Sequence, residues 1–140
     1  MGVIVTLAAV GGLIAIYMTL GYYHIQPFFT WFGYLMPRSC RLSDGTCVTI
    51  LEDPSAHLLG LPNALFGLVY YALVIVALST QSWLLYWIAR WASVLTLLMS
   101  AYLIYVLTAR LRQSCVLCYT GHLINVSLAV LLWNIPGPPS

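Results

Sequence analysis

Charge is almost absent from this sequence. The chain of 140 residues contains no lysine, five arginines and three acidic residues, so only 6% of its positions are charged. An average globular protein has about 25% charged residues. This low content excludes a water-soluble enzyme, and a disordered chain is excluded because disorder requires low hydrophobicity and high net charge. Five arginines without a lysine form no basic stripe, so nucleic acid is excluded as a partner.

Apolar residues take the place of the missing charge. They make up 62% of the chain, and its mean hydropathy is +0.96. A helix of about 20 mostly apolar residues crosses the hydrocarbon core of a bilayer. Four segments meet this requirement: residues 3–22, 63–78, 90–108 (which can begin as early as 83) and 115–133. We therefore predict an all-α integral membrane protein, a four-transmembrane-helix bundle whose partner is the lipid bilayer.

The flanks of these segments add three expectations. The first segment has no basic flank and no evident cleavage site, so we expect a retained helix rather than a signal peptide. The helical domain is expected over residues 1–134, and the proline- and glycine-rich residues 135–140 are expected to form an unstructured tail. A loop over residues 24–62 holds all three acidic residues, and its length favours a functional role. Its residues 54–61 are predicted to form a short interfacial helix that caps a pocket between the helices.

Four cysteines occur in two pairs. Cys40 and Cys47 lie in the long loop, and Cys115 and Cys118 form a Cys-x-x-Cys motif where the fourth helix begins. Successive membrane helices alternate in direction, so both pairs are expected on the same membrane face. Residues three apart share one face of a helix. This placement predicts a relay in which the loop pair faces water and the helix pair faces the membrane interior.

Local chemistry favours reactivity at the helix pair. Ser114 is a suitable N-cap for the fourth helix. The positive helix terminus, with Arg110 and Arg112 just upstream, favours the thiolate, which is the nucleophile of disulfide exchange. Three other interpretations remain open: cysteines that serve only as small apolar residues, a structural disulfide beside an inert helix pair, and a four-cysteine zinc site in a non-enzymatic membrane protein.

The ordered set of motifs resembles the vitamin K epoxide reductase family. The resemblance covers about residues 5–133. It rests on four helices, a cysteine pair in the loop after the first helix, the run Leu61-Pro-Asn-Ala-Leu-Phe-Gly67 that opens the second helix, and Cys115-Val-Leu-Cys118 at the start of the last. In the other family of quinone-linked disulfide generators, the Cys-x-x-Cys motif comes before the long cysteine loop, so the order found here is discriminating.

The resemblance implies a role for each cysteine. Cys118 faces a membrane quinone of the ubiquinone or menaquinone type and makes the transient contact with it. Cys115 exchanges with Cys47, and Cys40 exchanges with a thioredoxin-like protein. We expect no fused thioredoxin-like domain, so that this partner is a separate protein. The implied function is a membrane thiol oxidase, and the alternative is a quinone-epoxide reductase that uses the same relay.

The resemblance also implies a quinone pocket. Asn63 is expected to donate a hydrogen bond to a quinone carbonyl, although a helix N-cap is an equally open interpretation of this residue. Phe66 and Tyr70 are expected to line the pocket. His122 replaces a tyrosine of the animal enzymes and could donate to a quinone oxygen or pass protons, or it could be an interior histidine paired with a neighbour. Asp53 replaces a common serine. Both departures favour quinone reduction over epoxide reduction.

Two arguments disagree on the orientation of the cysteine face. Arg38, Arg41, Arg110 and Arg112 lie on that face, whereas only Arg90 lies on the other. The positive-inside rule alone therefore places the cysteines in the cytoplasm. The habit of the family places them outside the cytoplasm, where disulfides persist.

Overall fold

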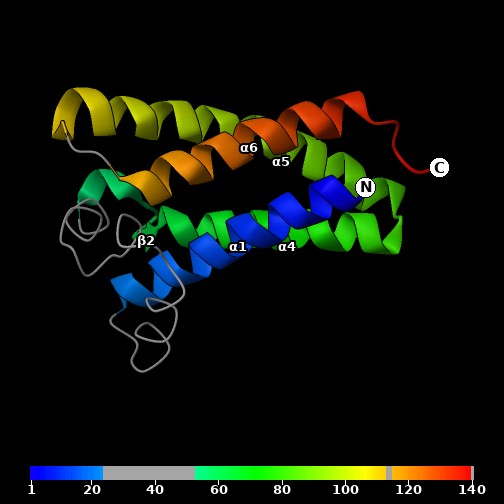
Figure 1. Ribbon diagram of the computed structural model, residues 1–140, viewed down its shortest axis with the longest axis horizontal. Helices are drawn as coiled ribbons and strands as arrows, with labels where there is room; N and C mark the ends of the chain where they lie inside the picture. The colour runs from blue at the N-terminus through cyan, green and yellow to red at the C-terminus, as the bar shows by residue number, and fades with distance from the viewer. Residues whose placement is uncertain (24–52, 113–114, 140) are drawn as a thin grey trace.

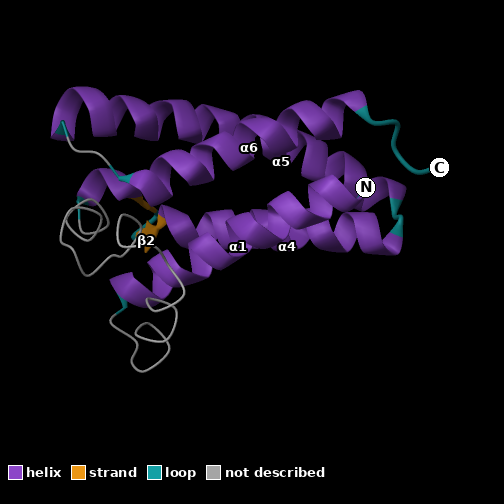
Figure 2. Ribbon diagram, in the orientation of Figure 1, coloured by secondary structure: helices purple, strands orange, loops and turns teal. Residues whose placement is uncertain are grey.

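Four long helices dominate the fold. The computed structural model describes residues 1–23, 53–112 and 115–139 (Figure 1). The helices lie roughly along one common axis (Figure 2). They are α1 (Gly2–Tyr22), α4 (Asn63–Thr80), α5 (Trp83–Tyr105) and α6 (Val116–Asn134). All four are long and apolar enough to cross a membrane, which confirms the predicted all-α bundle.

The third spanning segment is longer than the others. Helix α5 begins after Ser82, whose Oγ accepts a hydrogen bond from the backbone N–H of Leu85 at 3.5 Å. It continues as a π-helical segment, η4 (Val106–Leu111), so that the two together contain 29 residues. At about 1.5 Å per residue they extend about 43 Å, which exceeds the thickness of the hydrocarbon core. The combined segment can therefore reach past the hydrocarbon core toward the start of α6.

The predicted interfacial helix over residues 54–61 is wrong. The chain forms a single 3₁₀ turn, η3 (Pro54–Ala56), and then two short strands, β1 (His57–Leu58) and β2 (Leu61–Pro62). The strands pair in antiparallel register, with His57 opposite Pro62. A small hairpin, rather than a flat helix, therefore leads into α4.

The turn of this hairpin explains why the helix fails to form. Leu59 and Gly60 both have positive φ angles, +54° and +79°. Two consecutive residues with positive φ are what the favoured two-residue hairpin turn requires, and glycine adopts this conformation without steric cost. Pro62 has no backbone N–H to donate, so it cannot continue a helix from the preceding residues.

The bundle has two chemically different ends. Both termini and the connection between α4 and α5 lie at one end, here called the terminal end, whereas α4 and α6 begin at the other (Figure 1). The latter carries Cys115 and Cys118 and is here called the cysteine end. Between the ends, α1 packs against α4 and α6, and α5 packs against the same two helices. Large apolar side chains on the outer faces are exposed, as expected for contact with lipid: Leu84, Leu98, Leu123 and Val130.

Polar side chains at the terminal end are hydrogen-bonded. Four of them meet between α5 and α6: Tyr86, Arg90, Ser93 and Trp133. The hydroxyl of Tyr86 lies 2.9 and 2.8 Å from the carbonyl oxygens of Leu132 and Ile135. Arg90 donates from Nε to the Leu132 carbonyl at 2.8 Å. Trp133 donates from Nε1 to the Ser93 hydroxyl at 3.3 Å. The Arg90 guanidinium and the Tyr86 hydroxyl thus satisfy carbonyls at the end of α6, where a positive charge is favourable.

Candidate functional site

The first turn of α6 brings both described cysteines together. Cys115 has an extended backbone and is the N-cap of the helix, and its Sγ accepts a hydrogen bond from the backbone N–H of Cys118 at 3.4 Å. The prediction of Ser114 as the N-cap is therefore wrong by one residue. The sulfur of Cys115 takes the position that a hydroxyl oxygen usually occupies at a helix start.

The two cysteines differ in redox state. Cys115 is 1% exposed and takes part in a disulfide bond, whereas Cys118 is a free, half-buried thiol. Because Cys118 is free, the partner of Cys115 lies outside the described residues. Cys40 and Cys47 also lie outside them, so the roles predicted for these two residues stay predictions.

Beside Cys118, the four helices line a half-open cavity of about 370 Å³. Most of its lining is apolar, and it includes Gly11 and Met18 from α1 and Leu95 from α5. Ala56 and Leu58, which belong to the 3₁₀ turn and the hairpin, line it as well. Cavities of roughly 300–1,000 Å³ with apolar walls and a few polar groups are typical binding sites for small organic ligands.

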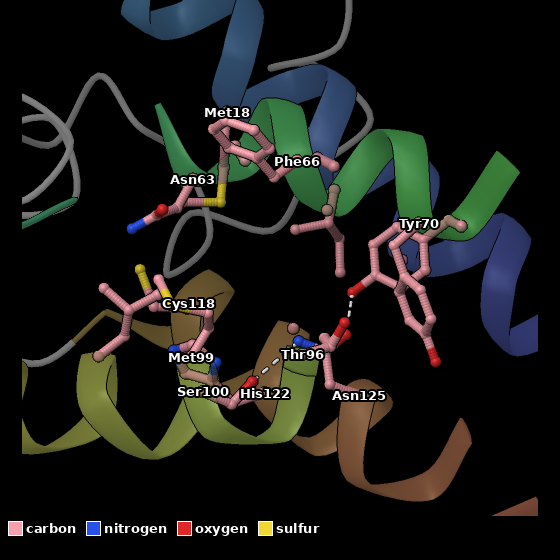
Figure 3. Close-up of a pocket in the computed structure, with 18 of the residues that line it drawn as sticks. Met18, Asn63, Phe66, Tyr70, Thr96, Met99, Ser100, Cys118, His122 and Asn125 are labelled. Atoms are coloured by element: carbon pink, nitrogen blue, oxygen red, sulfur yellow. Dashed lines mark hydrogen bonds between the residues drawn. The ribbon is translucent and has the colours of Figure 1, made fainter. Parts of the chain in front are cut away.

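The structure brings five of the predicted site residues to this cavity. Asn63, Phe66 and Tyr70 line it from α4, and Cys118 and His122 line it from α6. Asn63 and Phe66 lie on one side of the cavity, and Cys118 and His122 lie on the facing side (Figure 3). On each helix, residues three or four positions apart share one face, which explains how they converge.

Three polar atoms of these residues have no hydrogen-bond partner within the described part of the chain. They are Nδ2 of Asn63, the hydroxyl of Tyr70 and Nδ1 of His122, and all three are buried. Asn63 is the first residue of α4, whereas Pro62 is its N-cap, and no side chain caps this helix. The alternative of Asn63 as an N-cap is therefore wrong. For His122, Nδ1 finds no partner among the described residues, and the alternative of an interior histidine paired with a neighbour through its other nitrogen stays a prediction. An unpaired buried polar atom typically costs about 1–3 kcal/mol.

Sequence reasoning missed the polar residues one turn deeper. Asn125 lines the cavity and bonds through its side chain to Tyr71 and Ser100. The sequence spacing could have identified Asn125. His122 follows Cys118 by four residues and Asn125 follows His122 by three, so all three share one helix face. A polar side chain within an apolar spanning segment is itself a marker of a functional site.

A histidine anchors the hairpin at the cysteine end. Nδ1 of His57 lies 2.9 Å from the carbonyl oxygen of Asp53, and its ring lies 5.0 Å from that of Tyr22 at the end of α1. The hairpin is thereby held against α1. Asp53 stands where the family that the sequence resembles commonly has a serine. Its backbone carbonyl contacts His57 and so supports the hairpin.

A comparison with models of known protein families assigns the chain to a family. The model of the vitamin K epoxide reductase family matches residues 2–133, which is nearly the whole chain. Proteins of this family are membrane oxidoreductases that generate disulfides or reduce quinones or their epoxides. The match agrees with the bundle of four membrane helices and with the motifs quoted from the sequence. The chain therefore belongs to the vitamin K epoxide reductase family.

Proposed function

We propose that this chain is a membrane thiol oxidase that forms disulfides in a thioredoxin-like protein and passes the electrons to a membrane quinone. Overall, one partner dithiol and one quinone become one disulfide and one quinol. The observation that carries this proposal is the free thiol of Cys118 at the wall of an apolar cavity, one helical turn from a buried Cys115 that is already disulfide-bonded.

The cavity residues fit a quinone. The apolar walls of the cavity match the quinone ring, and the unpartnered Nδ2 of Asn63 can donate a hydrogen bond to a quinone carbonyl oxygen. His122 can donate from Nδ1 to another oxygen when that nitrogen carries the proton. A bound quinone would supply the capacity to take up two electrons and two protons. Cys118 lies on the same wall as His122, so the electron-donating sulfur and a proton-carrying group face the same space (Figure 3).

The cysteines would exchange in a balanced sequence. The thiolate of Cys47 attacks the sulfur of Cys115 in a Cys115–Cys118 disulfide, and Cys118 leaves as a thiolate. Cys40 then attacks Cys47, which closes the loop disulfide and releases Cys115. The resulting Cys115–Cys118 dithiol donates two electrons and two protons to the acceptor and closes its own disulfide again. A bridged Cys115 beside a free Cys118 is the arrangement that the first exchange would produce, and it supports this order of events.

The partner would enter at the loop pair. A reduced thioredoxin-like protein attacks the Cys40–Cys47 disulfide, becomes oxidised itself and leaves two thiols in the loop. This arrangement separates the two substrates, because the partner meets a water-facing pair and the acceptor meets Cys118 between the helices. Separation lets the protein partner exchange without entering the acceptor cavity.

The decisive test is stoichiometric. Purified protein in lipid nanodiscs is mixed with decylubiquinone and a reduced thioredoxin, and both products are counted. We expect one partner disulfide for each quinone reduced. Cys118→Ala should lower the rate by about a thousandfold, equivalent to about 4 kcal/mol of activation free energy. Ser127→Ala, on the same helix but away from the cavity, is the matched control. A Cys118→Ala variant with an unchanged rate would contradict the proposal.

Epoxide reduction is a second candidate, because the family includes quinone-epoxide reductases and His122 could protonate the epoxide oxygen. Supplying the nanodisc protein with a quinone epoxide and a dithiol distinguishes the two reactions. Formation of quinone would establish the second activity, whereas recovery of the unreacted epoxide would leave thiol oxidation as the function.

A further inference from the structure

A series of side-chain contacts crosses the bundle beside the cavity and touches all four helices. Tyr71 of α4 donates a hydrogen bond from its hydroxyl to Oδ1 of Asn125 on α6 at 2.7 Å. Asn125 donates from Nδ2 to the hydroxyl of Ser100 on α5 at 3.0 Å (Figure 3). The ring of Tyr71 packs on Gly11 of α1. These four residues are here called the interhelical tie.

Gly11 is needed for the tie to close. A Cβ atom added at Gly11 would lie 2.6 Å from Cζ and 2.7 Å from Cε1 of Tyr71, closer than such atoms approach in proteins. Tyr71 is 4% exposed, so its ring has little room to move away. The absence of a side chain at Gly11 therefore lets the ring lie against the α1 backbone while its hydroxyl reaches α6.

The tie joins the two walls of the cavity. Asn63 and Tyr71 belong to α4, and Cys118 and Asn125 belong to α6. Cys118 and Asn125 are seven residues apart, which is about 10.5 Å along the axis of α6. In residues 53–112 and 115–139, Tyr71–Asn125 is the only hydrogen bond between side chains of α4 and α6. All four residues of the tie line the cavity.

We propose that the interhelical tie fixes the separation of the α4 and α6 walls, and that Tyr71 and Asn125 are thereby positioning residues for electron transfer from Cys118 to the acceptor. This inference rests on the proposed function. Hydrogen bonds between membrane helices face no competing water and hold the helices in one register. A displacement of about 1 Å between reacting groups can cost up to about a hundredfold in rate.

The terminal end supplies a matched control. Tyr86 also uses its hydroxyl to join two helices, at 2.8–2.9 Å, but it lies at the opposite end of the bundle from Cys118. Tyr71→Phe and Tyr86→Phe therefore remove the same atom and a comparable bond between helices. A role limited to stability would give both variants the same kinetic behaviour.

The experiment measures two half-reactions separately in nanodiscs. In the first, pre-reduced protein is mixed with decylubiquinone in a single turnover. In the second, oxidised protein is mixed with reduced thioredoxin. We expect Tyr71→Phe to slow the first about tenfold and to leave the second unchanged. Tyr86→Phe should change neither rate, although both variants should lower the temperature of thermal unfolding.

A double-mutant cycle sharpens the test. Gly11→Ala should slow the first half-reaction as Tyr71→Phe does, because the added methyl group displaces the ring. In a Tyr71→Leu background, which lacks the displaced ring atoms, Gly11→Ala should have no further effect.

Three outcomes overturn the inference. Equal rates for Tyr71→Phe and the original chain in the first half-reaction, or equal slowing of both half-reactions, would show that the tie is only structural, while the proposed function would stand. A chain that reduces no quinone even with the tie intact would overturn the proposed function and this inference together.

Discussion

The two ends of the bundle differ in whether their buried polar groups are hydrogen-bonded. At the terminal end, Arg90 and Tyr86 satisfy the last carbonyls of α6, and Trp133 donates to Ser93. At the cysteine end, four buried polar atoms have no partner among the described residues: Nε2 of His57 and, around the cavity, Nδ2 of Asn63, the Tyr70 hydroxyl and Nδ1 of His122. Unpaired buried polar atoms destabilise a fold, so their clustering around one cavity marks that cavity as a place where a ligand supplies the missing partners.

This contrast separates stability from function along one molecule. Substitutions at the terminal end should lower stability and leave the activity of the folded protein intact. Substitutions at the unpartnered atoms of the cysteine end should weaken ligand binding and leave stability intact. Three substitutions test this separation.

Arg90→Leu should have the largest effect. The substitution removes the three hydrogen bonds that Arg90 donates to the carbonyl oxygens of Leu132, Trp133 and Ile135, and the single Tyr86 hydroxyl can replace the donor at only one of them. Hydrogen bonds from a charged donor contribute about 1.5–3 kcal/mol each, so we expect the free energy of unfolding to fall by about 3 kcal/mol in reversible unfolding in detergent. Arg90→Lys, which keeps the charge but loses the planar fork, should lose less. An Arg90→Leu variant with normal stability and reduced quinone turnover would contradict the assignment of stability to the terminal end and of activity to the cysteine end.

Asn63→Leu should have the next largest effect. The change removes the unpartnered Nδ2 while keeping the number and branching of the side-chain heavy atoms. We expect the KM for decylubiquinone to rise about tenfold, equivalent to about 1.4 kcal/mol, because the acceptor loses a hydrogen bond. The temperature of thermal unfolding without quinone should not fall. An unchanged KM would remove Asn63 from the acceptor site.

Tyr70→Phe should have the smallest effect. Its hydroxyl is buried without a described partner, and its removal leaves the ring in place. We expect a rise in KM of about threefold, because a neutral hydrogen bond contributes only about 0.5–1.5 kcal/mol. Stability without quinone should be equal or slightly higher. A clear loss of stability would show that the hydroxyl has a structural partner instead.

Much of this architecture follows from sequence alone, because lipid leaves few options. Uninterrupted apolar segments must form helices when no water can satisfy the backbone, and alternating helices bring Asn63 and Cys118 to the same end. The convergence of five predicted residues on one cavity is a consequence of helical periodicity. These features depend on local composition, which is readable without knowledge of tertiary contacts.

Other features depend on contacts that the sequence does not display. The hairpin over residues 57–62 forms because Leu59 accepts a positive φ angle, which few residues of its kind adopt. The sulfur of Cys115, rather than Ser114, caps α6. The bond between Tyr71 and Asn125 links residues 54 positions apart and requires a glycine on a third helix. Each of these depends on how two or more elements fit together.

Disulfide mapping of a Cys118→Ala variant examines the relay itself. Without Cys118, the thiolate of Cys115 can attack the sulfur of Cys47 and release Cys40 as a free thiol, and no second thiol in the helix can resolve the product. Free thiols are blocked by alkylation, and the linked peptides are identified by mass spectrometry. We expect a Cys47–Cys115 linkage with Cys40 alkylated. Alkylated Cys115 beside an intact Cys40–Cys47 disulfide would contradict the transfer of electrons between the two pairs.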